Sequence, residues 1–128
     1  MSLRTPMRRV LGAGSAKSGV HHWWVQRLTA VALVPLSVWF AVSLLALPSL
    51  DHATLAAWMR QTSTALLLIL LVLVAAWHSR LGLQVVVEDY VPGPAARTVT
   101  LVVVNFVHVL LAAAGVLAVL KVALGGAA

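Results

Sequence analysis

The chain has 128 residues, of which 62% are hydrophobic and only 9% are charged, and its mean hydropathy is +1.01. A soluble domain has roughly 25% charged residues, and a chain of this length cannot build a core that hides so much apolar surface from water. The net charge of +6 does not indicate nucleic acid, because the basic residues lie at the ends of apolar runs, as in membrane proteins. The absence of cysteine excludes a disulfide, a thiolate site and a cysteine-ligated iron–sulfur cluster.

Three apolar runs are long enough to cross a bilayer, which takes about 20 helical residues. They extend from Leu28 to Leu47, from Ser63 to Val87 and from Val99 to Leu124, and they predict spans at about 26–47, 60–89 and 98–124. Only helices or closed barrels satisfy backbone groups in lipid, and continuous rather than alternating runs favour helices. We therefore predict an all-α membrane protein, with a basic N-terminal segment at 1–18 and a three-helix transmembrane domain at 19–128.

Lysines and arginines predict the orientation, because cytoplasmic segments carry an excess of them. If the N-terminus is cytoplasmic, seven of the nine basic residues lie in the cytoplasmic half: Arg4, Arg8, Arg9, Lys17, Arg27, Arg80 and Arg97. Arg60 and Lys121 then lie on the opposite side, together with the C-terminus. We expect the first 17 residues to be loosely ordered unless a partner covers them.

Local signals refine the three-span plan. Pro35 predicts a kink or a locally repaired turn in the first span. In the following loop, Asp51 is a suitable N-cap for a short helix starting near Ala53, whose residues Leu55, Trp58 and Met59 would face the membrane interface. A turn is predicted at Val91-Pro92-Gly93-Pro94, between the second and third spans.

The second span carries ionisable residues that are costly to place in lipid and therefore indicate function. His78 and Asp89 are eleven residues apart, which puts them on one helix face and about 16 Å apart along the axis. His78 either bonds to a neighbouring helix or ligates a haem iron through a neutral imidazole. Gly82, one turn further on, would let a flat macrocycle approach the backbone.

Other polar residues in the spans have two interpretations each. His108 could supply a second haem ligand, but His108 and Asn105, three residues apart, are more typical of a polar stripe that joins helices. His78 and Arg80 could instead line the proton or anion path of a small transporter or channel subunit. As a further alternative function, the chain could be an assembly partner of another protein that binds no cofactor.

Candidate groups also lie at the end of the second span and at the start of the first. Asp89-Tyr90 is either an ordinary helix end at the interface or a phenol that hydrogen-bonds a quinone carbonyl, with a carboxylate for proton supply. Trp23 and Trp24 are typical of an interfacial aromatic belt. Arg27 either reaches to lipid phosphates or joins a nearby histidine in holding haem propionates.

Together, three elements of the chain resemble the small hydrophobic membrane-anchor subunit, the D type, of succinate dehydrogenase (complex II). They are the Gly-Val-His…Arg-Leu-Thr-Ala segment at 19–30, the His-x-x-x-Gly…Gln-Val-Val…Asp-Tyr-Val segment at 78–91, and the three-helix plan with an inside N-terminus. The resemblance covers most of the chain after residue 18. It implies a multi-pass protein of the cell inner membrane that catalyses nothing alone.

The resemblance also implies cofactors and roles. His78 matches the axial ligand of haem b, which is shared with a partner anchor subunit of the cytochrome b556 type. Tyr90 matches a ubiquinone-contacting tyrosine, Asp89 the acid beside it, and Arg27 an arginine near the haem propionates. A histidine precedes that arginine in the family, and His21 is favoured over His22 because it follows Gly19-Val20. The implied partners are this second anchor subunit, the iron–sulfur subunit, the flavoprotein subunit and membrane lipid. Arg80 departs from the family pattern.

Overall fold

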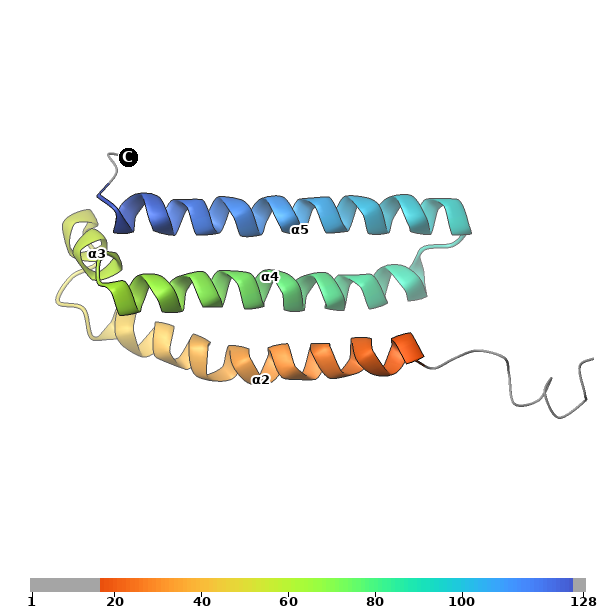
Figure 1. Ribbon diagram of the computed structural model, residues 1–128, viewed down its shortest axis with the longest axis horizontal. Coiled ribbons are helices and arrows are strands. Elements are labelled where there is room, and N and C mark those ends of the chain that lie inside the picture. Colours follow the sequence, from red (N-terminus) through yellow and green to blue (C-terminus); the bar gives the residue numbers. More distant parts are fainter. Residues whose placement is uncertain (1–16, 126–128) are drawn as a thin grey trace, which may run out of the picture.

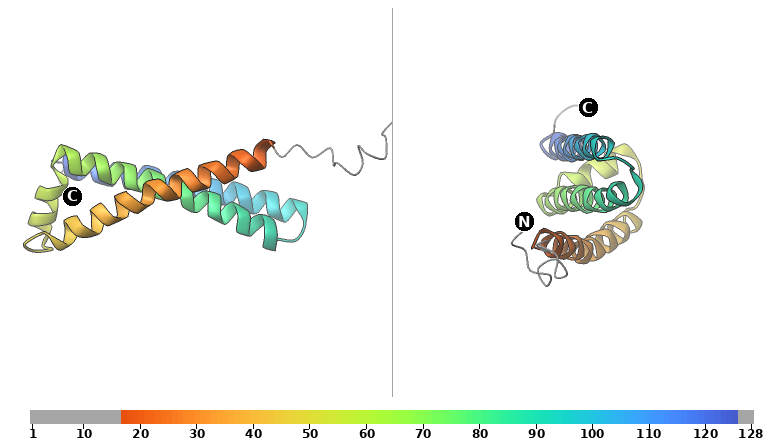
Figure 2. Two further views of the ribbon diagram at one scale, coloured as in Figure 1. Left: turned by 90° about the horizontal axis from the view of Figure 1, so that it is seen from below. Right: turned by 90° about the vertical axis from the view of Figure 1, so that its right-hand side faces the viewer.

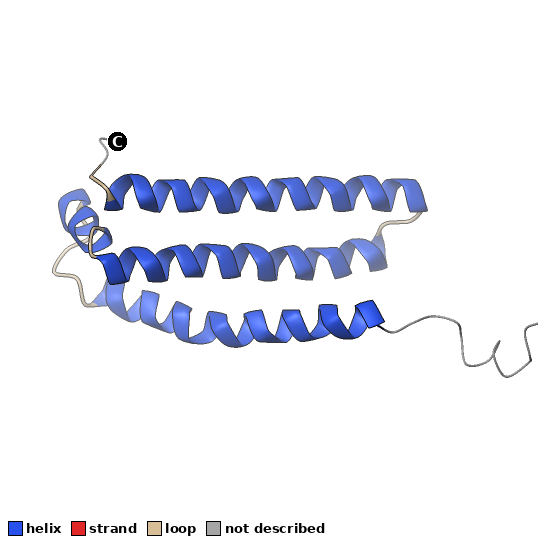
Figure 3. Cartoon of the chain, in the orientation of Figure 1, coloured by secondary structure: helices blue, strands red, loops and turns tan. Residues whose placement is uncertain are grey.

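The computed structural model describes residues 17–125, which form four helices (Figure 1). They are α2 (Lys17–Leu45), α3 (His52–Met59), α4 (Thr62–Tyr90) and α5 (Pro94–Ala123). Figure 3 shows helices and loops but no strand in this part of the chain. Three of the helices contain spans long and apolar enough to cross a membrane, namely Gly19–Leu45, Thr62–Tyr90 and Pro94–Ala123. The predicted all-α fold with three spans is therefore confirmed.

Helix α2 begins earlier than the predicted first span. The span prediction started near residue 26, just before the apolar run that begins at Leu28, whereas the helix starts at Lys17. The more polar turns before Arg27 continue the helix beyond the lipid-soluble run, and they carry Trp23 and Trp24. The segment 1–17, which was expected to be loosely ordered, lies outside the described residues except for Lys17. Pro35 lies inside α2 without ending it, and Figure 1 shows the helix gently bent. The hydroxyl of Ser37 donates to the carbonyl of Leu33 at 2.6 Å, a type of bond that accompanies helix bending.

The three long helices form one layer, with α4 in the middle. Helix α2 packs on one side of α4 and α5 packs on the other, and the described parts of α2 and α5 do not pack against each other. Figures 1 and 2 show this order, and the left view of Figure 2 shows α2 crossing α4 obliquely. Because α4 has neighbours on two sides only, both faces of the layer expose parts of it.

The α4–α5 contact is close because one helix carries a glycine. A Cβ atom built on Gly115 of α5 would lie 2.7 Å from Cγ1 of Val72 on α4. Real Cβ atoms do not come so near to other carbon atoms, so an alanine would force the two helices or the valine side chain to move. Gly115 thus permits the approach of α5 to α4, as small residues do in membrane helix pairs.

The packed core lies at the α3 end of the layer. Buried Ala65, Leu68 and Val119 contact a shell that includes Trp39, Phe40, Trp58 and Met59. The rings of Trp39 and Trp58 stack with their centroids 6.0 Å apart. Helix α3 therefore fills the gap between the ends of the long helices.

The cap of α3 is the one predicted from the sequence. Asp51 is the N-cap residue, and its Oδ1 accepts a hydrogen bond of 2.9 Å from the backbone N–H of Thr54. A hydrogen bond from the Ser49 hydroxyl, and then bonds from Thr54, lower the pKa of the Asp51 carboxyl from 3.8 to about 2. The carboxylate that caps α3 is therefore ionised throughout the neutral pH range.

The opposite end of the layer carries the beginning of α2 and the short connection between α4 and α5 (Figure 1). Gly93, in this connection, has a φ of 85°, which L-amino acids with side chains rarely adopt. Its carbonyl accepts from the N–H of Arg97 at 3.1 Å and so starts α5. The sharp connection places the start of α5 beside the end of α4, with Asp89 and Tyr90, at the end of the layer where α2 begins.

Candidate functional site

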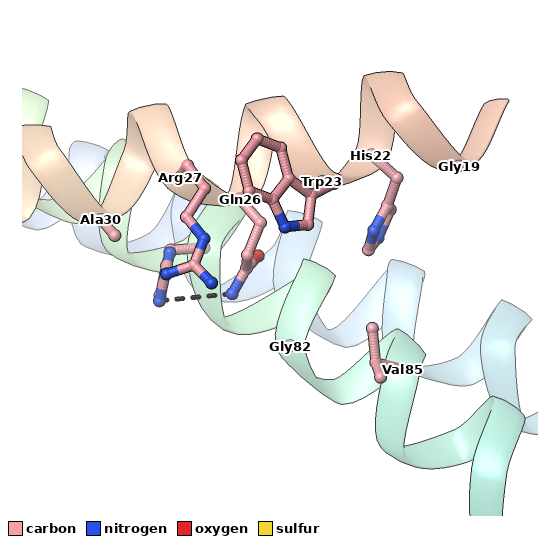
Figure 4. Close-up of a pocket in the computed structure, with 9 residues that line it drawn as sticks. Gly19, His22, Trp23, Gln26, Arg27, Ala30, Gly82 and Val85 are labelled. Atoms are coloured by element: carbon pink, nitrogen blue, oxygen red, sulfur yellow. Dashed lines mark hydrogen bonds between the residues drawn. The ribbon is translucent and has the colours of Figure 1, made fainter. Parts of the chain in front are cut away.

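A groove of about 610 Å³ lies between α2 and α4, on one face of the layer, and we call it the His78 groove (Figure 4). Helix α4 contributes His78, Gly82 and Val85. The lining residues from α2 are Gly19, His22, Trp23, Gln26, Arg27 and Ala30. The segments 19–30 and 78–91 are distant in the sequence, and the fold brings them together here.

His78 is held by two side chains of α2. Its Nδ1 lies 2.9 Å from Oγ1 of Thr29, and its Nε2 lies 3.4 Å from Nε2 of Gln26. The second of these contacts is the dashed line in Figure 4. His78 thus contacts a neighbouring helix, as one of the two interpretations from the sequence expected.

The Thr29 hydroxyl determines which ring nitrogen of His78 carries the proton. Oγ1 of Thr29 lies 2.9 Å from the carbonyl oxygen of Val25 and 3.0 Å from that of Gln26. A carbonyl can only accept, so the single hydroxyl proton points along the helix and Oγ1 accepts from Nδ1–H of His78. This arrangement favours the tautomer with the proton on Nδ1, in which the lone pair of Nε2 points to the Gln26 amide in the groove.

Two buried polar atoms of residues lining the groove have no hydrogen-bond partner. They are Nε2 of His22 and Oε1 of Gln26. Such atoms are uncommon in native proteins and each calls for an explanation, such as a bound group. A Cβ atom built on Gly82 would meet only the Gln26 amide, at 3.7 Å, so the glycine leaves an open stretch of α4 backbone beside His78. These features fit a large, flat, polar-edged ligand.

The cationic residues divide between two grooves. Arg27 lines the His78 groove, and its guanidinium lies 5.4 Å from the centre of the Trp23 ring. His21 is exposed and lines a smaller groove of about 250 Å³ that includes Trp77 and Arg80. His22 lines both grooves. The structure therefore places His22, rather than His21, beside His78 and Arg27.

Asp89 and Tyr90 lie at the last turn of α4, where both side chains are exposed. Tyr90 is 81% exposed, and it is about 18 Å from His78 along the helix axis. Neighbouring Glu88 accepts a 2.8 Å bond from the Gln84 amide and so faces its own helix. Within the described residues, Asp89 and Tyr90 do not enclose a cavity.

His108 joins α5 to α4. It is 8% exposed, its Nδ1 lies 2.8 Å from the carbonyl oxygen of Val104, and its Nε2 lies 3.2 Å from Oγ of Ser79. The carbonyl must accept from Nδ1–H, so Nε2 accepts from the serine hydroxyl. With both nitrogens occupied, His108 has the helix-joining role that the polar stripe indicated.

No group of three or more histidine, cysteine or acidic side chains in residues 17–125 could hold a metal ion. His78 and Arg80 bond to different neighbouring helices, which separates them rather than aligning them along one path.

Comparison with known proteins adds independent information. A family model described as succinate dehydrogenase/fumarate reductase transmembrane subunit matches residues 1–118. The succinate dehydrogenase hydrophobic membrane anchor subunit of Rickettsia bellii (strain RML369-C) is 33% identical over 116 residues, covering 91% of this chain and 93% of the relative. The protein of the same description from Paracoccus denitrificans is 31% identical over 121 residues, covering 94% and 93%. No solved structure matches the chain significantly.

The layer of three lipid-length helices defines a multi-pass membrane protein. The matched residues and the relatives specify which kind. The chain belongs to the family of succinate dehydrogenase/fumarate reductase transmembrane subunits.

Proposed function

We propose that this chain is the membrane-anchor subunit of a succinate:ubiquinone oxidoreductase in the cell inner membrane. It binds haem b together with a partner anchor subunit of the cytochrome b556 type and forms part of the ubiquinone-reduction site. It catalyses nothing alone, and it attaches the flavoprotein and iron–sulfur subunits to the membrane. The family and the names of the relatives support the anchor role, and the His78 groove supports the cofactor.

The haem assignment rests on the hydrogen bonding of the two ring nitrogens of His78. Iron takes the lone pair of a neutral imidazole nitrogen, and metal-bound histidines usually donate their other N–H to a nearby acceptor. The Thr29 hydroxyl is such an acceptor on Nδ1, and Nε2 presents its lone pair to the groove. In our proposal Nε2 of His78 would hold the haem iron in place of its weak contact with the Gln26 amide. A haem held there would supply one-electron redox chemistry.

The cationic end of the groove suits the haem propionates. Arg27 lines it, and the buried Nε2 of His22 has no partner within the described residues. Protonated or neutral, an imidazole N–H can donate to a carboxylate, and a guanidinium can donate to it in a bidentate manner. We therefore propose Arg27 with His22 as the propionate-binding pair. His21, which the sequence favoured, lies in the smaller groove with Arg80.

The quinone part of the proposal rests on the end of α4. Reduction of ubiquinone consumes two electrons and two protons, so the site needs a hydrogen-bond donor to the carbonyl and a route for protons from water. The Tyr90 hydroxyl would donate to the carbonyl, and the Asp89 carboxylate would pass on protons. Both side chains are exposed in the chain alone, so other subunits would complete the pocket.

The haem assignment is tested with His78→Ala and a matched control, His108→Ala, in the purified complex. Absorption spectra are recorded after oxidation and after reduction by succinate. We expect His78→Ala to lose or alter the low-spin haem signal, and His108→Ala to keep it. Succinate oxidation by a soluble dye, measured alongside, should change much less. A wild-type spectrum in His78→Ala, or loss of the signal in His108→Ala, would show that the ligand is wrongly assigned.

A further inference from the structure

The second large groove of the chain, about 640 Å³, lies between α4 and α5. We call it the Arg80 groove, and its lining includes Leu73, Trp77, Arg80, Asn105 and Val109. Arg80 is two residues after His78, so the two side chains leave α4 about 200° apart. The Arg80 groove is thus separate from the His78 groove and opens on the other side of α4.

Arg80 is held in place by neutral groups. Its Nε donates to Oδ1 of Asn105 on α5, and its guanidinium lies 5.2 Å from the centre of the Trp77 ring. Neither partner neutralises the charge. The Nη groups are the donors that remain for an anion, in the planar arrangement that matches a carboxylate.

The depth of Arg80 makes its charge significant. Helix α4 has 29 residues, or about 44 Å, and Arg80 lies about 6 Å from its midpoint and about 15 Å from its Tyr90 end. The hydrocarbon layer is about 30 Å thick, so Arg80 starts well within it. Asn105 is eleven residues into α5, at about the same depth. The bond to Asn105 therefore directs the guanidinium sideways rather than toward the membrane surface.

This chain cannot supply the counter-charge. Its three acidic residues are Asp51, Glu88 and Asp89, and all three lie at the ends of the layer rather than near its middle. The nearest in sequence, Glu88, is about 12 Å along the axis from Arg80 and bonds to Gln84. A second copy would bring the same three acids, and lipid phosphates lie at the membrane surface. An unpaired cation at this depth is strongly unfavourable.

We propose that the Arg80 groove is the docking surface for a transmembrane helix of a different chain, one that carries an aspartate or glutamate at the depth of Arg80. The carboxylate accepts from the Nη groups, and apolar side chains of the same helix pack on Leu73 and Val109. The proposal requires that the chain spans a membrane as part of a complex, but it does not depend on haem or quinone binding.

The occupant is identified by photo-crosslinking in the complete complex in its native membrane. A photoreactive phenylalanine derivative replaces Val109, which lines the groove, and in a matched control it replaces Leu110, which is 67% exposed and does not line it. After irradiation, mass spectrometry should find position 109, but not 110, joined to a transmembrane peptide of another chain that contains an acidic residue. Attachment to lipid alone, or to a second copy of this chain, would overturn the proposal.

The role of the charge is tested in the same assay with Arg80→Gln and Arg80→Lys. We expect the glutamine variant to lower the crosslink yield at position 109 by about tenfold or more, because the partner carboxylate is then left unpaired in the groove. The lysine variant should recover part of the yield. An unchanged yield in Arg80→Gln would overturn the ion pair. The haem spectrum, recorded on the same samples, reports separately on the His78 groove and should not follow the Arg80 substitutions.

Discussion

The most informative side chain that the sequence analysis did not single out is Thr29. The pattern of His78, Gly82 and Asp89 is visible within one helix, because helical spacing places these three residues on one face, with Tyr90 next to Asp89 in the sequence. The pairing of Thr29 with His78 is not visible, since it depends on the rotation and height of α2 against α4. The same rotation places His22, and not His21, among the residues that line the groove with Arg27, which spacing to Arg27 did not indicate. In the sequence, Thr29 is part of the Arg-Leu-Thr-Ala motif, but nothing in the motif assigns it a role.

Thr29→Val tests whether the threonine hydroxyl prepares His78 for iron. Valine keeps the shape of the side chain but removes the acceptor for Nδ1–H, so the proton is no longer fixed on that nitrogen. Loss of such an outer partner typically lowers metal affinity about 10- to 100-fold. We expect reduced haem occupancy in the purified complex and a shifted midpoint potential. Thr29→Ser, which keeps the hydroxyl, should resemble the wild type. Equal occupancy and potential in the valine and serine variants would remove Thr29 from the site.

Tyr90→Phe tests the proposed quinone contact. It removes one hydroxyl from a side chain that is already exposed, so packing within the chain is preserved. A hydrogen bond to a group that gains charge during reduction contributes roughly 1–3 kcal/mol, which corresponds to about 5- to 150-fold in rate. Succinate:ubiquinone turnover should fall, while reduction of a soluble dye upstream should not.

Asp89→Asn should likewise lower succinate:ubiquinone turnover without lowering dye reduction. The pH profile of the ubiquinone turnover should change if Asp89 passes on protons. Full ubiquinone turnover in both variants would place the quinone elsewhere.

At the scale of helices, the sequence predicted which helices exist better than it predicted where each helix begins and ends. The three spans and the Asp51-capped α3 follow from apolar run length and from capping chemistry, both of which are local. The predicted first span begins later than α2, because lipid solubility, rather than helix formation, was used to mark it. The close approach of α5 to α4 at Gly115 could not be derived, because a lone glycine in an apolar run does not show which helix it faces.

Gly115→Ala tests that approach. The added methyl group would overlap Cγ1 of Val72, and overpacking of this kind costs about 1–3 kcal/mol. We expect the chain in detergent micelles to lose helical circular dichroism at a lower concentration of denaturing detergent than the wild type. Val72→Ala combined with Gly115→Ala should restore part of the loss, because the Val72 methyl groups that the new side chain would meet are gone. If Gly115→Ala alone matches the wild type, the helices are not as close as described.

For the whole molecule, the charge distribution and the fold agree on which residues lie at the same end. The starts of α2 and α5 lie at the same end of the layer, and Arg27 and Arg97 lie toward that end. Arg60 and Lys121 lie toward the α3 end. The order of helices within the layer was only partly predictable. The short connection of α4 to α5 forces them to be neighbours, but the longer connection through α3 leaves the position of α2 open.

The proposed orientation is tested with single cysteines, for which the natural chain supplies a cysteine-free background. Pro92→Cys marks the α4–α5 connection and Leu50→Cys marks the loop before α3, and both positions are exposed. In sealed right-side-out vesicles, a membrane-impermeant thiol reagent should label Leu50→Cys. It should label Pro92→Cys only after the vesicles are opened. The reverse pattern would invert the topology.

The concentration of packing at the α3 end sets an order of events during biogenesis. That end has its stacked aromatic rings and buried core within the chain itself, so it forms as soon as the three helices are inserted. In the half of α4 toward Tyr90, Leu81 and Val87 are buried but lie outside this core, and grooves open between α4 and its two neighbours. We therefore expect this half to open locally more readily than the α3 end. If the chain binds haem and neighbouring subunits as proposed, their binding would stabilise this half after the α3 end has packed.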